Sequence, residues 1–274
     1  MRENTGAIGL ALFLTAAAFA QPAAQPQAVE KDPLVFDVAS VKPGDCVPPN
    51  CGLVRPTVGV GGYHIAGATI RTIMTVAYTV TDRQITGGPA WMNSDRWDIE
   101  AKADRQRTSD ELHVMLQHLL EERFHLKLRH ENRQESVYSL SLAKDGPKFK
   151  SHDPDDKDYA PIGAQMVRAA DSSICFGING VNVTMDYLAF FLSRGQDRMI
   201  INQTGLTGRW DVRLQYIPDA AAMARGPDGA ALNFSPDCET LAAALPKQLG
   251  LRMEAGKGPV PYLVVEGLEK PSEN

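Results

Sequence analysis

Arg96-Trp97-Asp98-Ile99 (RWDI) occurs a second time in this 274-residue chain, almost unchanged, as residues 209–212 (RWDV). In each tetrapeptide the tryptophan and the aliphatic residue two positions later point to one side of an extended chain, and the aspartate points to the other. The alternation continues beyond both tetrapeptides and is typical of a strand with one buried face. The two tetrapeptides therefore predict two equivalent strands.

The similarity extends in both directions from these strands, in the same order in both copies. Upstream, Thr69 and Thr184 each precede a predicted helix, and threonine is a favoured helix N-cap. Downstream, five apolar positions recur at a constant offset: Leu116, Leu120, Phe124, Leu126 and Leu128, then Leu241, Leu245, Leu249, Leu251 and Met253. Residues 138–147 then match residues 262–271. We therefore predict a tandem duplication.

Each copy is predicted to form a β-α-β-β-α-β-β unit. The two final strands are expected at His125–His130 and Val137–Leu142 in the first copy, and at Leu251–Glu254 and Tyr262–Val265 in the second. One helical stripe and one strand face are apolar in each copy, so we expect an α+β fold with the helices packed on one face of a mainly antiparallel sheet. Pro246 lies inside the last predicted helix and should kink it.

The N-terminal region predicts processing and export. An apolar run from Ala7 to Ala18 is shorter than a membrane span of roughly 20 residues and ends near Ala18-Phe19-Ala20, the small-x-small pattern of a signal peptidase site. We predict a signal peptide at residues 1–20 that is cleaved after Ala20, and a periplasmic or secreted protein; a short membrane anchor is the alternative. A disordered leader at 21–33, repeat 1 at 34–150, a linker at 151–172 and repeat 2 at 173–274 should follow.

The four cysteines predict disulfides. They are Cys46, Cys51, Cys175 and Cys238, and an even number in an exported chain favours pairing. Three pairings are possible; we favour Cys46–Cys51, because residues 48–50 (PPN) read as a turn, and this leaves Cys175–Cys238. A zinc site is the alternative, but the chain has no Cys-x-x-Cys pair and no histidine close in sequence to any of the four.

The charge and hydropathy of the chain limit the classes of partner that it can bind. The net charge is −5 and the chain contains no basic run, so nucleic acid and anionic membranes are poor candidates. No stretch outside the signal is apolar enough to span a bilayer, so we expect no stable membrane insertion after signal removal. The expected partner is an unknown envelope protein or a glycan.

Familiar catalytic patterns are weak or missing in the sequence. Four residues could suggest a metal site: His118, Glu121, Glu122 and His125. His118 and Glu121, however, fall opposite the leucine stripe of the predicted helix, as solvated residues do. Ser141 and Lys144 fit a Ser-x-x-Lys pattern, but within a predicted strand rather than at a helix start. We assign no catalytic, metal-binding or cofactor-binding residue and expect no cofactor.

The aromatic and charged residues of the duplicated strands are interpreted structurally. Trp97 and Trp210 share a strand face with aliphatic residues, which favours core packing over a carbohydrate platform. The charged residues beside them are interpreted as exposed strand charges: Arg96, Asp98, Arg209 and Asp211.

Six segments together resemble a known family. They are Phe36–Pro43, Ile85–Trp91 (ITGGPAW), Asp95–Ala103 (DRWDIEAKA), Met115–Lys127 (MLQHLLEERFHLK), Thr204–Asp211 (TGLTGRWD) and the ending Glu269–Asn274. The chain resembles exported proteins of unknown function that are greatly multiplied in soil Acidobacteria of the Solibacter type. The resemblance implies an extracytoplasmic protein and no known activity. The order of elements also resembles, more loosely, the short N-terminal domain of secretins and TonB-dependent receptors, which binds other proteins in the periplasm.

The leading functional hypothesis is a non-catalytic extracytoplasmic binding or sensing module. The alternatives are an envelope hydrolase with an unrecognised site between the two repeats, and a purely structural envelope protein. A cleft between the copies, lined by polar groups with shifted pKa values, would favour the hydrolase. A flat apolar patch or an unpaired sheet edge would favour the binding module.

Overall fold

The computed structural model describes residues 34–46, 51–57, 61–153, 163–168, 173–217 and 233–271. Residues 34–274 form one compact unit. Within the described part the fold is α+β, with four α-helices and three mostly antiparallel sheets. The predicted signal peptide, its cleavage site and the leader lie outside the described residues. No helix in the described ranges is long and apolar enough to cross a membrane.

The first sheet and two helices come from the N-terminal half. The sheet has the order β1-β5-β3-β2 and is antiparallel throughout. Its strands are β1 (Val38–Pro43), β2 (Leu53–Pro56), β3 (Gly62–Thr69) and β5 (Arg96–Lys102). The helices are α1 (Ile70–Ala77) and α2 (Ser109–Phe124), with 3-10 turns η1 (Asp82–Gln84) and η2 (Ala90–Asn93) between them. Thr69 caps α1 by accepting a hydrogen bond from the Thr72 N–H.

The second sheet and two helices come from the C-terminal half. The sheet has the order β7-β11-β9-β8. Its strands are β7 (Lys150–Ser151), β8 (Gly163–Arg168), β9 (Ile174–Val183) and β11 (Trp210–Tyr216). The helices are α3 (Met185–Ser193) and α4 (Leu241–Ala244), the latter followed by a π-helical turn, η3 (Leu245–Leu249). Thr184 caps α3 by accepting from the Tyr187 N–H.

Pro246 alters the helix that contains it. The α-helical turn α4 ends at Ala244, and the chain continues as the π-helical turn that includes Pro246. Proline has no N–H to donate to the preceding turn, and a π-turn is one way to absorb that loss. The expected kink therefore takes the form of a change in helix type.

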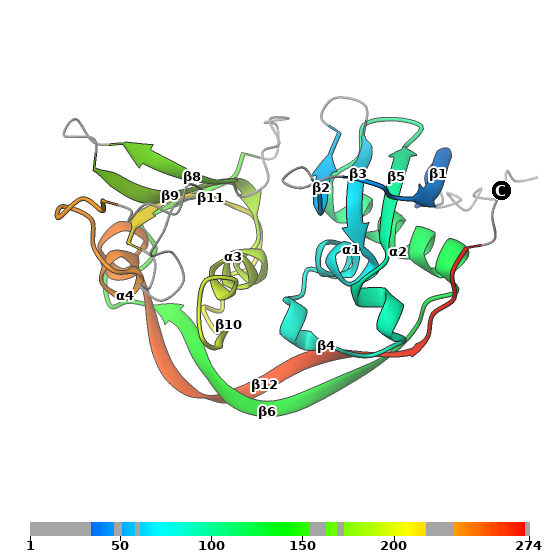
Figure 1. The fold of residues 1–274 in the computed structure, drawn as a ribbon. Coiled ribbons are helices and arrows are strands. Elements are labelled where there is room, and N and C mark those ends of the chain that lie inside the picture. The colour runs from blue at the N-terminus through cyan, green and yellow to red at the C-terminus, as the bar shows by residue number, and fades with distance from the viewer. Residues whose placement is uncertain are drawn as a thin grey trace, which may run out of the picture. The chain divides into compact units, whose positions relative to one another are not determined.

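The third sheet is built around two long strands. It has the order β10-β6-β12-β4, where β6 is Lys127–Leu142, β12 is Leu251–Gly267, β4 is Ile85–Gly87 and β10 is Met199–Asn202. β6 and β12 pair antiparallel along their full lengths, as Figure 1 shows. The prediction of two final strands at the end of each copy is therefore wrong in this respect, because each predicted pair is one continuous strand.

The long strands exchange partners between the halves. β6 begins after α2, yet its far end pairs in parallel with β10, where Tyr138 faces Ile200. β12 begins after η3, yet its far end pairs in parallel with β4, where Leu263 faces Ile85. The last strand of each half thus pairs with a short strand of the other half, and all four strands belong to the third sheet.

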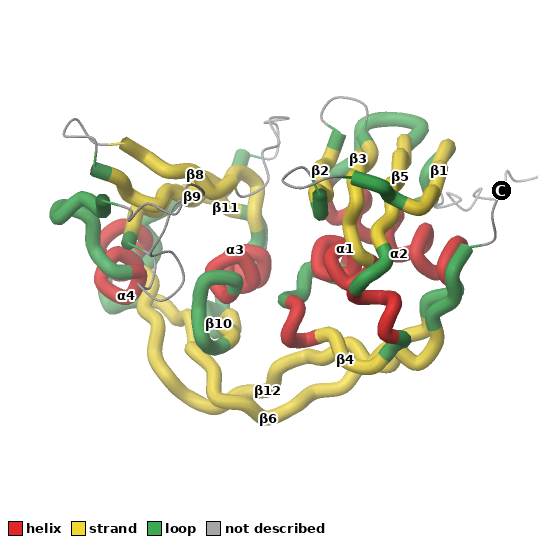
Figure 2. Tube along the Cα trace, viewed as in Figure 1, coloured by secondary structure: helices red, strands yellow, loops and turns green. Residues whose placement is uncertain are grey.

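Two hydrophobic clusters fill the space between the sheets. The first combines Ile99 of β5 and Leu116 of α2 with Leu263 and Val265 of β12. The second combines residues of β11, α3, α4 and η3 with Leu140 of β6. The helices therefore lie between an upper sheet and the β6–β12 pair (Figure 2). The predicted arrangement places the helices on one face of a single sheet and so lacks the β6–β12 pair that covers their other side.

Candidate binding site

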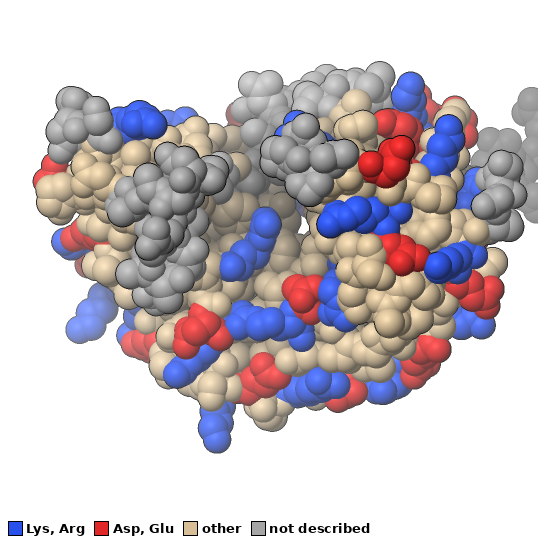
Figure 3. Space-filling model, in the orientation of Figure 1, with Lys and Arg blue, Asp and Glu red and all other residues tan. Residues whose placement is uncertain are grey.

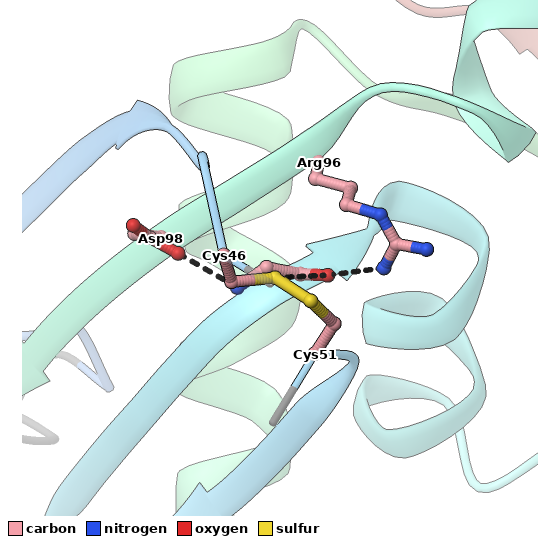
Figure 4. Close-up of a disulfide and its surroundings, with 5 residues drawn as sticks. Cys46, Cys51, Arg96 and Asp98 are labelled. Carbon is pink, nitrogen blue, oxygen red and sulfur yellow. Dashed lines mark hydrogen bonds between the residues drawn. A yellow bond between two sulfur atoms is a disulfide. The ribbon is translucent and has the colours of Figure 1, made fainter. Parts of the chain in front are cut away.

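Each duplicated tetrapeptide contains an Arg-Trp-Asp sequence, which we call an RWD motif. The first, residues 96–98, stabilises a register shift between β3 and β5. Gly67 adopts φ +55°, and the register between β3 and β5 shifts beside it. The Asp98 carboxylate accepts a hydrogen bond from the Gly67 N–H (2.7 Å), and the Arg96 guanidinium donates one to the Gly67 carbonyl (2.8 Å; Figure 4). A Cβ at this position would lie 1.9 Å from the Cys46 Sγ, which explains the glycine.

The second RWD motif makes the same contacts. Asn182 adopts φ +60°, beside a register shift between β9 and β11. The Asp211 carboxylate accepts from the Asn182 N–H (3.0 Å), and the Arg209 guanidinium donates to the Asn182 carbonyl (2.9 Å). The interpretation of these four charged residues as exposed strand charges missed this role. We call each set of two hydrogen bonds an RWD clamp.

The tryptophans of both motifs pack against phenylalanines. The Trp97 ring lies edge-on to Phe124, with centroids 5.1 Å apart, and the Trp210 ring lies edge-on to Phe149 at 5.3 Å. Both indole N–H groups are buried without a hydrogen-bond partner in the described structure. These side chains belong to the packing of the two halves rather than to an exposed platform.

The structure contains two disulfides. They join Cys46 to Cys51 and Cys175 to Cys238, with Cα–Cα distances of 5.6 and 6.1 Å. Both distances lie in the usual range for a disulfide. The first bridge lies beside the RWD clamp at Gly67 (Figure 4), and the second joins the start of β9 to the segment before α4.

The weak sequence candidates for chemistry are not brought together. The imidazole Nδ1 of His118 lies 2.7 Å from the carbonyl oxygen of Leu34, on an exposed face of α2. The Ser141 hydroxyl accepts a hydrogen bond from Arg252 across the β6–β12 pair. Within the described ranges, no group of three or more His, Cys, Asp or Glu side chains could hold a metal ion.

A cleft lies between α1–η1 and α3. Its volume is about 670 Å³. In Figure 3 the surface is hollowed between the α1 and α3 regions, and basic side chains border the hollow. The residues that line the cleft are Thr72, Thr75, Val76, Thr79, Val80, Thr81, Asp82, Arg83, His113, Tyr187, Phe190, Ser193, Arg194 and Gln196. Both halves of the chain contribute to it.

Three rings form one wall of the cleft. The His113 ring of α2 lies 6.4 Å from the Tyr187 ring of α3, and Tyr187 lies 5.8 Å from Phe190. Burial lowers the pKa of His113, and the nearby Asp110 opposes this shift only in part. The imidazole is therefore neutral at neutral pH, and this wall offers ring surfaces with polar edges.

Thr79 has an unusual backbone conformation at the cleft. Its φ is +52°, and a β-branched residue rarely adopts a positive φ. Such strain is often found at functional sites. Thr79 also lines a second cavity of about 380 Å³, together with Phe190, Met199 and Val260. No sequence motif marks Thr79, so sequence reasoning missed it.

Hydrogen bonds across the cleft tie η1 to the other half. The Arg83 guanidinium donates to the Asp197 carbonyl (2.6 Å), and the Gln84 amide donates to the Pro261 carbonyl (2.9 Å). The Thr81 hydroxyl lies 3.3 Å from the Met199 sulfur. These contacts join η1 to the loop before β10 and to β12, and they help to fix the width of the cleft.

The polar groups of the cleft favour binding over nucleophilic chemistry. The Ser193 hydroxyl already donates to the Ala189 carbonyl and accepts from the Ile200 N–H, both at 2.8 Å. It therefore serves to hold β10 against α3. The remaining lining offers hydroxyls, rings and guanidinium groups, which can bind and orient a ligand.

Comparisons with known proteins identify a family only. Searches of curated proteins and of solved structures gave no significant match. Residues 71–268, well over half of the chain, match the family model described as "Protein of unknown function (DUF3738)", and the chain therefore belongs to that family.

Proposed function

We propose that this protein is a non-catalytic extracytoplasmic binding or sensing module that holds its ligand in the cleft between α1–η1 and α3. The observation that carries the proposal is the lining of the cleft, in which three rings face threonine hydroxyls and two arginines. The volume of about 670 Å³ lies within the range of small-molecule sites. An envelope glycan, or part of an envelope protein, is the expected ligand.

The compartment is part of the proposal. We propose a periplasmic or secreted protein whose signal peptide is removed after Ala20, from the exported Acidobacterial group that the sequence resembles. The two disulfides support this location, because such bonds persist mainly in oxidising compartments.

We also propose that the chain is a tandem duplication, with repeat 1 at 34–150, a linker at 151–172 and repeat 2 at 173–274. The equivalent RWD clamps at Gly67 and Asn182 support it. So do the exchanged strands, in which β4 pairs in parallel with β12 and β10 pairs in parallel with β6. In this view each repeat resembles a secretin-type binding unit that lends its last strand to its neighbour.

The binding proposal is tested by filling the cleft. The wild-type mature protein and the variant Val76→Trp are mixed with the small-molecule fraction of a periplasmic extract, and thermal unfolding is measured. A ligand that binds only the folded state should raise the melting temperature of the wild type and not of Val76→Trp, whose indole occupies the cleft. Met166→Trp, on the exposed side of β8, is the matched control and should respond like the wild type.

The same experiment addresses the other hypotheses. The ligand site in this cleft would be overturned if the extract raised the melting temperatures of the wild type and Val76→Trp equally, or if it raised neither. NMR spectra of the extract, recorded before and after incubation, distinguish binding from turnover. Loss of substrate signals with the appearance of products would favour the hydrolase instead.

A further inference from the structure

The charges in the cleft are unevenly balanced. Among the described lining residues there is one carboxylate, Asp82, and it lies 3.6 Å from the guanidinium of Arg71, which offsets its charge. Arg83 and Arg194 also line the cleft. In the part of the chain that the structure describes, no carboxylate lies within ion-pair distance of either guanidinium group. The cleft therefore carries uncompensated positive charge in a protein whose net charge is −5.

The two arginines lie near the same end of the cleft. The Arg83 guanidinium donates to the carbonyl of Asp197, three residues after Arg194 on the loop that follows α3. Gln196, which lies between Arg194 and Asp197 in the sequence, also lines the cleft. The guanidinium carbon of Arg194 lies 5.7 Å from the centre of the Phe191 ring, a cation–π distance. This part of the lining thus contains two arginines and one glutamine.

The wall formed by the rings has a different character. His113, Tyr187 and Phe190 supply partly buried rings, and the imidazole is held neutral by its burial. A ligand that satisfies both regions has a negative group at one end and a ring or apolar body at the other. Guanidinium groups bind carboxylates and phosphates through paired N–H donors.

We propose that the cleft binds an anionic ligand, in which a carboxylate or phosphate on a cyclic body pairs with Arg83 and Arg194 while the body packs on Tyr187 and Phe190. This inference rests on the proposed binding function and specifies the chemical class of the ligand. The anion supplies the counter-charge that the described residues do not provide for the two arginines. Packing of the cyclic body on the ring wall would give a role to the partly exposed aromatic side chains of α3.

The test compares acidic probes with their neutral counterparts at constant ionic strength. Benzoate and phenyl phosphate are compared with benzyl alcohol, and glucuronate with glucose, by calorimetric titration of the mature protein. At least one acidic probe should bind saturably, and its neutral counterpart should bind at least tenfold more weakly, since charge-assisted hydrogen bonds are the stronger class. Preference between benzoate and phenyl phosphate then distinguishes a carboxylate from a phosphate ligand.

Matched variants locate the anion. Arg194→Gln should weaken binding of the acidic probe about tenfold or more, and Lys144→Gln, which removes the same charge from an exposed position away from the cleft, should not. Arg83→Gln should act like Arg194→Gln. Equal binding of acidic and neutral probes, no binding of any acidic probe, or unchanged binding by Arg194→Gln would overturn the inference. If the extract still stabilises the wild type but not Val76→Trp, the binding function stands and only the anionic ligand class is wrong.

Discussion

At the scale of single residues, the two RWD clamps make a specific prediction about stability. Replacing Asp98 or Asp211 with Ala leaves the N–H of Gly67 or Asn182 without its acceptor. Leaving a buried or partly buried donor unsatisfied costs about 1–3 kcal/mol, and we expect each variant to lose about this much in urea unfolding. Because the clamps lie in different sheets, the double variant should lose roughly the sum.

Glu100→Ala is the control for these variants. Glu100 lies on β5 two residues after Asp98, and its carboxylate pairs with the exposed side chain of His64. Removing an exposed pair of this kind changes stability by about 0.5 kcal/mol or less. A loss in Asp98→Ala no greater than in Glu100→Ala would mean that the clamp does not stabilise the sheet.

Sequence reasoning at this scale identified the caps and missed the clamps. Thr69 and Thr184 were predicted as N-caps, and each accepts a hydrogen bond from the first turn of its helix. The alternating pattern assigns Asp98 and Asp211 to a side of the strand, but it does not reveal a register shift in the neighbouring strand. Asparagine at position 182 gives no clear signal of its positive φ, whereas a glycine at position 67 permits one.

At the scale of single elements, the starts of α2 and α4 form a natural comparison. The Thr108 hydroxyl and the Glu111 carboxylate form a reciprocal capping box at α2. The hydroxyl of Thr240, in the same position before α4, caps nothing. Thr108→Ala should therefore cost about 1 kcal/mol in chemical unfolding, and Thr240→Ala should cost clearly less. Equal losses would show that the box contributes nothing beyond helix propensity.

The long strands show where pattern reading fails. Residues 255–261 (AGKGPVP) contain the glycines and prolines of a turn, so a break between two strands was predicted there. In the structure this segment stays extended because each residue faces one on β6, from Tyr138 to Asn132. The partner strand is more than 100 residues away in sequence. Local composition cannot report a pairing of that kind.

At the scale of the whole molecule, the exchanged strands predict that neither half is complete alone. Residues 34–153 contain β4 and the first cluster but lack Leu263 and Val265, which close that cluster. Expressed alone, this fragment should unfold without cooperativity, and mixing it with residues 154–274 should restore a cooperative transition in differential scanning calorimetry. A monomeric first fragment that folds cooperatively by itself would contradict the importance of the exchange.

The cleft also depends on the whole molecule, because residues of both halves line it. The sequence therefore could not specify it. Its residues come from α1, η1, α2 and α3, and their proximity depends on how β6 and β12 join the two halves. The sequence predicted that a site between the copies was worth considering, but it did not identify Thr79, Arg83 or Arg194. None of these residues belongs to a recognisable motif.

The exchange of strands also constrains the order in which the chain can fold during synthesis. The first cluster needs Val265, and the backbone N–H of Glu269 donates to the Phe124 carbonyl at the end of α2. The N-terminal half must therefore wait until residues 263–269 have been made. Contacts so distant in sequence slow folding. A chain whose first core stays open until β12 emerges therefore remains unfolded for longer than one built from two independent halves.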